Sequence, residues 1–207
     1  MNLSDIHVDL LKETFNVGVG QAATALSEIA GGEEIVLSVP QIHLLTISEL
    51  SEQVRTVSGE KLCSVVEEFQ GPFQGRAMML YSERESLELV KLMLGETFPV
   101  EQMSEMEGEA LCEVGNIVLN ACLSAMADML GFEIATEIPS LMIGHPNEVL
   151  MGDEGEAMKD KRVLYLKMDF SMQRFQLQGH IGFFLDFESI TQLVACLDEY
   201  LNSMLEM

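Results

Sequence analysis

The sequence predicts an α+β fold, an antiparallel-dominated sheet with two long helices and two further helices packed on it. Apolar residues make up 48% of the 207 residues, enough for one sizeable core. The chain also repeats itself, and each copy has the order helix, β-prone stretches, helix. We therefore expect a single domain over residues 1–207, made of two pseudo-symmetric halves at about 1–98 and 99–207.

The repeat aligns residues 9–40 with residues 109–139. Both segments contain Glu-x-x-Asn, followed by glycine and then proline at closely matching spacing. Later parts also match, since residues 85–94 (ESLELVKLML) correspond to residues 188–197 (ESITQLVACL). A repeat of this length predicts two similar structural halves.

Each half is expected to begin with a long helix, at about 5–30 and 104–130, because apolar residues recur there at helical spacing. Glycines that can end these helices follow at Gly31, Gly32 and Gly131. A second helix should close each half, at about 84–95 and 187–205, with Ser82 and Asp186 as N-caps.

Between the helices lie β-prone stretches, the last two of each half forming a hairpin. They are expected at about 34–46, 60–70, 73–82, 133–143, 162–171 and 174–186. Two acidic segments, 95–109 and 144–160, are expected to be loops.

The composition excludes several classes of function. A net charge of −23 disfavours binding to nucleic acid and to anionic lipid. The N-terminus lacks the basic and apolar regions of a signal peptide, so we expect a cytoplasmic protein. The four cysteines form no C-x-x-C pair and are expected to be free thiols. The four histidines are scattered, so no metal site built by this chain alone is expected.

Each long helix presents carboxylates and one carboxamide on a single face. Residues at i, i+4 and i+7 share a helix face, and the two sets are Asp9, Glu13 and Asn16, and Glu109, Glu113 and Asn116. One such set is typical of an ordinary solvated surface. A second set, at the same spacing and the same place in its half, favours a function.

The chemistry open to such a face is limited. It holds no nucleophile paired with a base, and Cys112 projects about 100° away from Glu113 around the helix. An asparagine cannot act as a base, but its carboxamide can position a water molecule. In phosphoryl transfer, positioning and charge stabilisation supply most of the catalysis. The face would suit that reaction if a partner supplied the phosphoryl group and the metal.

This pattern resembles that of the CheC/CheX/FliY family of chemotaxis phosphatases: Asp or Ser, three residues, Glu, two residues, Asn, 22 residues and Pro. The second copy has Glu109, Glu113 and Asn116, with 22 residues before Pro139. The first copy has 23 residues before Pro40. Glu109 departs from the Asp or Ser of the pattern. The resemblance covers nearly the whole chain, and two copies at this length resemble CheC most. It implies the pseudo-two-fold CheC-like fold.

The resemblance implies an enzyme that removes the phosphoryl group from the phospho-aspartate of CheY. By that resemblance, Glu13 and Glu113 form a salt bridge with a lysine of CheY, while Asn16 and Asn116 orient the attacking water. CheY holds the Mg²⁺, so this chain is expected to bind no cofactor itself.

Asp9 and Glu109 are then expected to contact the partner. The deamidase CheD is a further possible partner by the same resemblance. Two alternatives stay open: a non-catalytic adaptor for CheD or a receiver domain, and a component of the flagellar motor switch. The sequence ranks neither of the two copies above the other.

Overall fold

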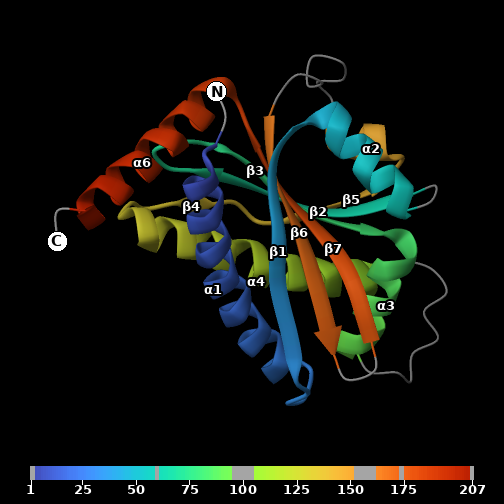
Figure 1. The fold of residues 1–207 in the computed structure, drawn as a ribbon. Helices are drawn as coiled ribbons and strands as arrows, with labels where there is room; N and C mark the ends of the chain where they lie inside the picture. The colour runs from blue at the N-terminus through green and yellow to red at the C-terminus, as the bar shows by residue number, and fades with distance from the viewer. Residues whose placement is uncertain (1–2, 59–60, 95–104, 152–161, 173–174, 206–207) are drawn as a thin grey trace.

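The computed structural model describes residues 3–58, 61–94, 105–151, 162–172 and 175–205 (Figure 1). The elements follow in chain order: α1 (Asp5–Ile29), β1 (Ile35–Thr46), α2 (Ile47–Ser58), β2 (Leu62–Gln70), β3 (Gly75–Ser82), α3 (Glu83–Leu94), α4 (Glu105–Leu130), β4 (Ala135–Thr136), β5 (Ser140–Gly144), α5 (Pro146–Met151), β6 (Arg162–Met172), β7 (Phe175–Leu185) and α6 (Phe187–Leu205). This arrangement confirms the predicted α+β fold.

Local signals in the sequence determine where the four predicted helices begin and end. Ser4 caps α1 by accepting a hydrogen bond from the backbone N–H of His7. Gly31 and Gly131 follow α1 and α4 with φ of 74° and 72°, a left-handed conformation that glycine adopts without strain. The hydroxyl of Ser82 accepts from the backbone N–H of Glu85 before α3, and Asp186 caps α6 in the same way.

The sheet is antiparallel throughout its described pairs. Its order is β1-β6-β7-β3-β2-β4, and β5 also pairs with β2. The predicted hairpins are confirmed as β2–β3 and β6–β7. The outer strands cross between the two repeats, because β1 pairs with β6 and β5 pairs with β2. With β5 as the neighbour of β2, the order is β1-β6-β7-β3-β2-β5. If β1, β2 and β3 are exchanged with β5, β6 and β7, the same order is obtained, read from the other end. The boundary between two halves stays a prediction.

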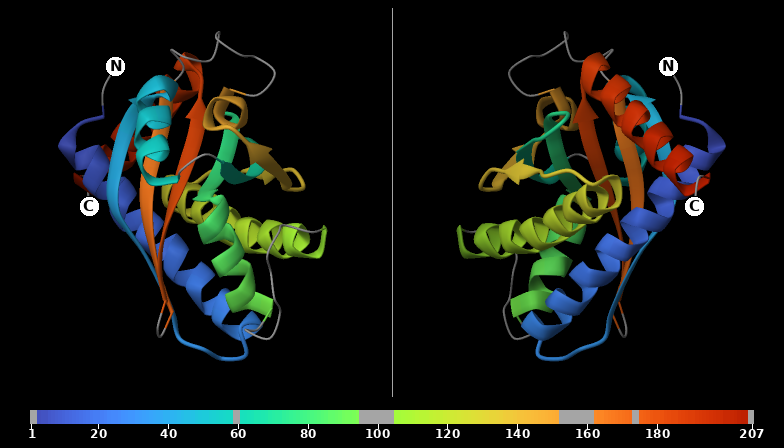
Figure 2. Two further views of the ribbon diagram at one scale, coloured as in Figure 1. Left: turned by 90° about the vertical axis from the view of Figure 1, so that its right-hand side faces the viewer. Right: turned by 90° about the vertical axis from the view of Figure 1, so that its left-hand side faces the viewer.

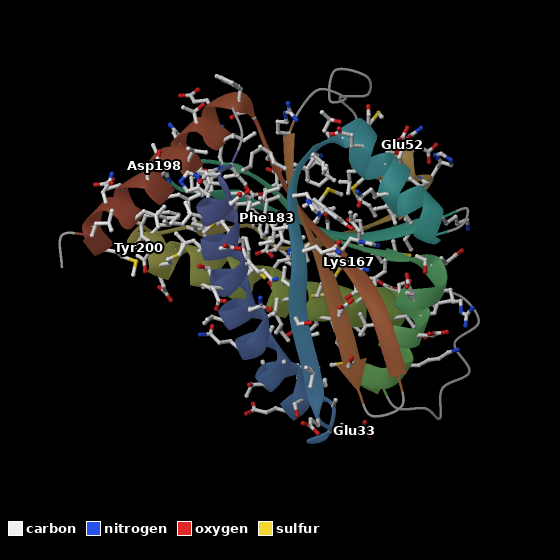
Figure 3. All side chains as sticks on the ribbon, viewed as in Figure 1. Glu33, Glu52, Lys167, Phe183, Asp198 and Tyr200 are labelled. Carbon is white, nitrogen blue, oxygen red and sulfur yellow. The ribbon has the colours of Figure 1, made fainter. Side chains whose placement is uncertain are left out.

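Helices cover both faces of the sheet (Figure 2). One face packs against α1, α3, α4 and α6 in the larger core. There Phe183 of β7 stacks on Phe15 of α1 with ring centroids 5.4 Å apart (Figure 3). The other face packs against α2 and α5 in a smaller core. The two motif-bearing helices therefore lie on the same side of the sheet.

Close backbone contacts fix the positions of α1 and α4. A side chain at Gly18 would place its Cβ 2.7 Å from the carbonyl oxygen of Ala121, so the two helices meet there with only glycine between them. At Gly115 a Cβ would lie 2.5 Å from a methyl carbon of Val65, so α4 also rests directly on β2. α4 is long and apolar enough to span a membrane, but 56% of that stretch is buried inside the protein. Its apolar composition follows from this packing.

Three sequence predictions about helices and loops were wrong. Residues 47–58 form α2, which was not predicted, although Ile47, Leu50 and Val54 recur at helical spacing and are buried. Within the predicted loop 144–160, residues 146–151 form α5; residues 152–160 lie outside the described part. The predicted loop 95–109 ends earlier, because α4 begins at Glu105. In both segments, exposed acidic residues near the start of a helix (Glu105, Glu109 and Glu148) resembled loop composition.

Candidate functional site

Both sets of predicted site residues lie on the surfaces of their helices. The acids of the first set, Asp9 and Glu13, are exposed on α1, and Asn16 is half-buried. The second set repeats this on α4: exposed acids and a half-buried asparagine, at Glu109, Glu113 and Asn116. Both asparagines are thus less exposed than the acids on the same face. Their partial burial follows from the hydrogen bonds that each carboxamide makes.

The carboxamide of Asn16 is bound to the backbone of β1. Its Oδ1 accepts from the N–H of Val39 at 2.8 Å. Its Nδ2 donates to the carbonyl of Lys12 at 2.8 Å and to that of Val39 at 3.4 Å. Val39 is only 1% exposed, and the β1–β6 register shifts between Ser38 and Gln41. Asn16 thus pairs with backbone at the point where the ladder to β6 is irregular.

The carboxamide of Asn116 has different partners. Its Oδ1 accepts from Nδ2 of Asn120, one turn along α4, at 2.8 Å. Asn120 in turn accepts at its Oδ1 from the hydroxyl of Thr136 at 3.1 Å. Among the described residues, Nδ2 of Asn116 makes no hydrogen bond. The oxygen of this carboxamide is therefore engaged, and its Nδ2 group is available to donate a hydrogen bond.

Asn116 opens onto a cleft of about 450 Å³ between α4 and the segment that joins β4 to β5. The cleft is lined by Glu109, Cys112, Glu113, Asn116, Thr136, Glu137, Ile138 and Pro139. All three sequence-predicted residues of the second set thus line one concave surface.

The two copies differ most at the residue before the proline that both copies contain. In the first copy this is Val39, buried within the continuous strand β1. In the second copy it is Ile138, which is 93% exposed in the gap between β4 and β5. The strand interruption therefore leaves room for the cleft and places a large apolar side chain at its edge.

The surroundings of the cleft are acidic. Glu109, Glu113 and Glu137 line it and are exposed. Burial, together with the charge of Glu109, raises the pKa of the Cys112 thiol, which makes it a poor nucleophile. Within the described ranges, no group of three or more His, Cys, Asp or Glu side chains is placed to hold a metal ion. The site can contribute docking charge and a carboxamide.

Sequence reasoning missed three polar residues beside this site. Asn120 lies four residues after Asn116, so its spacing could have revealed it. Thr136 is brought in by β4, which pairs with β2 at Phe69. Glu67 of β2, only 1% exposed, has Thr136 and Asn120 as polar neighbours. The last two contacts come from tertiary structure and have no local signal.

Comparisons with known proteins agree with this picture. No family model matches the chain. The CheY-P phosphatase CheC of Bacillus subtilis is 21% identical over 201 residues, which cover 94% of this chain and 95% of that protein. The resemblance to the CheC/CheX/FliY family is confirmed.

Solved structures of FliY, FliM and CheX share this fold. FliY of Thermotoga maritima matches with a TM-score of 0.77 and 16% identity over 97% of this chain and all of that one. FliM in a complex with SpeE from H. pylori matches with a TM-score of 0.70 and 9% identity, covering 96% of this chain and 98% of that one. CheX in a complex with CheY, BeF3 and Mg²⁺ from Borrelia burgdorferi matches with a TM-score of 0.50 and 17% identity, covering 84% and 96%. At these identities, the likeness shows the fold.

Proposed function

We propose that this chain removes the phosphoryl group from the phospho-aspartate of a CheY-like receiver domain, and that the Glu113–Asn116 face of α4 carries the reaction. The observation that carries the proposal is the carboxamide of Asn116: it is held on one side by Asn120 and opens on the other to a cleft lined by exposed Glu113. The phosphatase named among its relatives, and the CheX–CheY complex, support the choice of partner.

Glu113 is proposed to dock the receiver domain. It is exposed and forms no ion pair within the described residues, so its carboxylate can accept a lysine from the partner. Glu109 lies one turn before it on the same face and adds negative charge to the contact. Opposite charges across an interface speed association and fix its register. The exposed side chain of Ile138 gives the contact an apolar anchor.

Asn116 is proposed to orient the attacking water. In hydrolysis, the water oxygen bonds to phosphorus while the bond to the aspartyl oxygen breaks, and the aspartate leaves as a carboxylate. A carboxamide suits this task because placing the water supplies most of the effect. The receiver domain is expected to bring its own Mg²⁺, which would neutralise charge on the phosphoryl oxygens.

The Glu13–Asn16 face of α1 is proposed to be the weaker site. Glu13 and Asp9 are exposed and can dock a partner, but both polar atoms of the Asn16 carboxamide already bond to backbone. Asn16 therefore has no N–H left to donate to a water or a phosphoryl oxygen unless one of these bonds breaks. A cytoplasmic location and CheD as a partner stay predictions from the sequence.

A second candidate is a non-catalytic binding module. It is favoured by the fold shared with FliM and by the occupied carboxamide of Asn16. In that case the acidic faces would bind a receiver domain without turnover. The two functions make opposite predictions for Asn116, because an adaptor does not need an oriented water.

The test is release of phosphate from a phosphorylated CheY-like receiver domain. Wild type, Asn16→Ala, Asn116→Ala and the double variant are compared, with Asn202→Ala of α6 as a matched control because Asn202 is exposed on a different helix. We expect Asn116→Ala to lose most activity, Asn16→Ala to keep most of it, and the control to match wild type. A double variant as active as wild type would refute the mechanism.

A further inference from the structure

The carboxamide of Asn116 is at one end of a chain of polar contacts that runs from the cleft into the sheet. Asn120 donates to Asn116 at 2.8 Å, and Thr136 donates to Asn120 at 3.1 Å. Thr136 belongs to β4, whose pairing with Phe69 attaches it to β2. The contacts therefore connect α4 to the sheet behind the proposed site.

In this structure, the order of donors and acceptors along these contacts sets which way the Asn116 carboxamide faces. The Thr136 hydroxyl donates to Oδ1 of Asn120, so the Nδ2 group of Asn120 is the end directed at Asn116. Asn116 must then present its oxygen to Asn120. Its Nδ2 group is left to face away from Asn120, where it can donate to an incoming water or phosphoryl oxygen.

Glu67 lies at the buried end of this chain of polar contacts. Side chains on a strand alternate, and Cys63, Val65 and Phe69 of β2 belong to the core beneath α1 and α4. Glu67 falls on that same face and is 1% exposed. Among the described residues, no donor lies in hydrogen-bonding geometry to its carboxyl oxygens, although Thr136 and Asn120 are its polar neighbours.

A carboxyl group at this position is unfavourable for folding. Burying a polar group without a hydrogen bond costs free energy, and burial raises the pKa of Glu67 accordingly. An apolar side chain would fill the position at lower cost. Packing does not account for a carboxyl group at this position. A role beside Thr136 and Asn120 does.

Among the described residues, the first copy has no such chain of polar contacts. The residue four positions after Asn16 is Gly20, which has no side chain to donate. Asn16 is instead held by the backbone of Val39, with its oxygen and its nitrogen both engaged. The chain of side-chain contacts therefore belongs to the second copy, where the carboxamide faces a cleft.

We infer that Asn120 and Thr136 are positioning residues that hold the Asn116 carboxamide with its Nδ2 toward the cleft, and that Glu67 supports them from the core. This inference rests on the proposed function of Asn116. Asn120 and Thr136 act through Asn116 and contribute to turnover more than to partner binding.

The first test uses near-isosteric changes that remove the donors, although Asn120→Asp also introduces a carboxyl group. Asn120→Asp cannot donate to Asn116, and Thr136→Val cannot donate to Asn120, whereas Thr136→Ser keeps the hydroxyl. Misplacing a group that positions a reactant lowers rates by about ten- to a hundredfold. We therefore expect Asn120→Asp and Thr136→Val to lower kcat at least about tenfold. Thr136→Ser should stay within about threefold of wild type, as should the control Thr191→Val, a half-buried threonine of α6 whose hydroxyl donates to the carbonyl of Phe187 in the same helix.

The second measurement separates positioning from docking. The Kd for the receiver domain with beryllofluoride bound should change less than about threefold in Thr136→Val, because Glu113 and Ile138 are untouched. A loss of affinity equal to the loss of rate would overturn the inference. So would a Thr136→Val variant with the turnover of wild type.

Glu67→Met provides an independent measurement. Replacing a buried carboxyl with an apolar side chain of similar length should leave Tm unchanged or raise it, while kcat falls. A variant that is fully active contradicts a supporting role for Glu67. Failure of the proposed function gives a different result: Asn116→Ala would then stay active. If Asn116→Ala is inactive but Asn120→Asp and Thr136→Val are not, only the inference about positioning fails.

Discussion

Replacing Asn16 with alanine should destabilise the fold more than it impairs hydrolysis. The Asn16 carboxamide is the hydrogen-bond partner of Val39, whose N–H donates to Oδ1 at 2.8 Å and which is only 1% exposed. Alanine removes that acceptor and provides no other. The equivalent change at Asn116 removes a contact with Asn120, a half-buried side chain that can turn to water.

The magnitude follows from these contacts. Leaving a buried N–H without a partner costs about 1–3 kcal/mol, so the loss at Val39 is about 2 kcal/mol. The longer bond to the Val39 carbonyl, at 3.4 Å, adds little. Alanine has the higher helix propensity and returns about 0.5 kcal/mol in either variant. Asn16→Ala should therefore lose about 1.5 kcal/mol net, while Asn116→Ala should stay within about 0.5 kcal/mol of wild type.

For a domain of this size, 1 kcal/mol corresponds to about 2–4 °C in Tm. Asn16→Ala should then melt about 3–6 °C below wild type. Urea unfolding gives the free energy directly, and the difference between the two variants cancels the propensity term. A phosphate-release assay well below both melting temperatures gives activity for the folded proteins. Asn16→Ala with wild-type stability and little activity would refute the structural role assigned to Asn16.

Three further predictions concern packing, pH and thiol reactivity. Gly18→Ala should destabilise the fold by about 1–3 kcal/mol in urea unfolding because its Cβ would enter the α4 backbone, whereas Gly20→Ala, with nothing within 4 Å, should stabilise it by up to about 1 kcal/mol. Burial lowers the pKa of His180 to about 4 from 6.5, so the unfolded chain binds its proton first. The stability that neutral His180 contributes is full above pH 6.5 and falls as pH drops toward 4. Over that range, Tm should therefore fall less steeply in His180→Gln than in wild type. Equal slopes of Tm against pH in the two proteins would contradict this. In the native state, Cys112 should react with a thiol reagent before Cys122, whose pKa burial raises to about 12; reaction in the reverse order would show that Cys122 is accessible.

Much of the fold could be predicted because its signals are local. Apolar spacing and glycine ends specified both long helices, and two consecutive β-prone runs specified each hairpin. Helix α2 was missed although Ile47, Leu50 and Val54 carry the helical period, because it directly follows β1 without a glycine or proline between them. The pairing of β1 with β6 could not be predicted, since no local pattern specifies which strands far apart in sequence become neighbours.

The candidate site shows the same division between local and long-range information. The helix period alone placed Glu113 and Asn116 on one face, and the structure places both at the cleft. The sequence could not distinguish Asn16 from Asn116, because the residues that decide their surroundings, Val39 and Ile138, are both large and apolar. Val39 is buried because it lies within the continuous strand β1, whereas Ile138 is 93% exposed because it lies in the gap between β4 and β5.

The two motifs therefore have unequal capacity for the same chemistry, and the inequality comes from backbone. A carboxamide whose oxygen and nitrogen both bond to a buried strand is held rigidly but has no N–H left to donate to a water molecule. A carboxamide whose oxygen alone is engaged is equally oriented and keeps a donor for the reactants. Asn116 satisfies the second condition and Asn16 the first. If Asn16 contributes to turnover at all, its contribution should increase in variants that loosen Val39 from α1, and this dependence should not appear at Asn116.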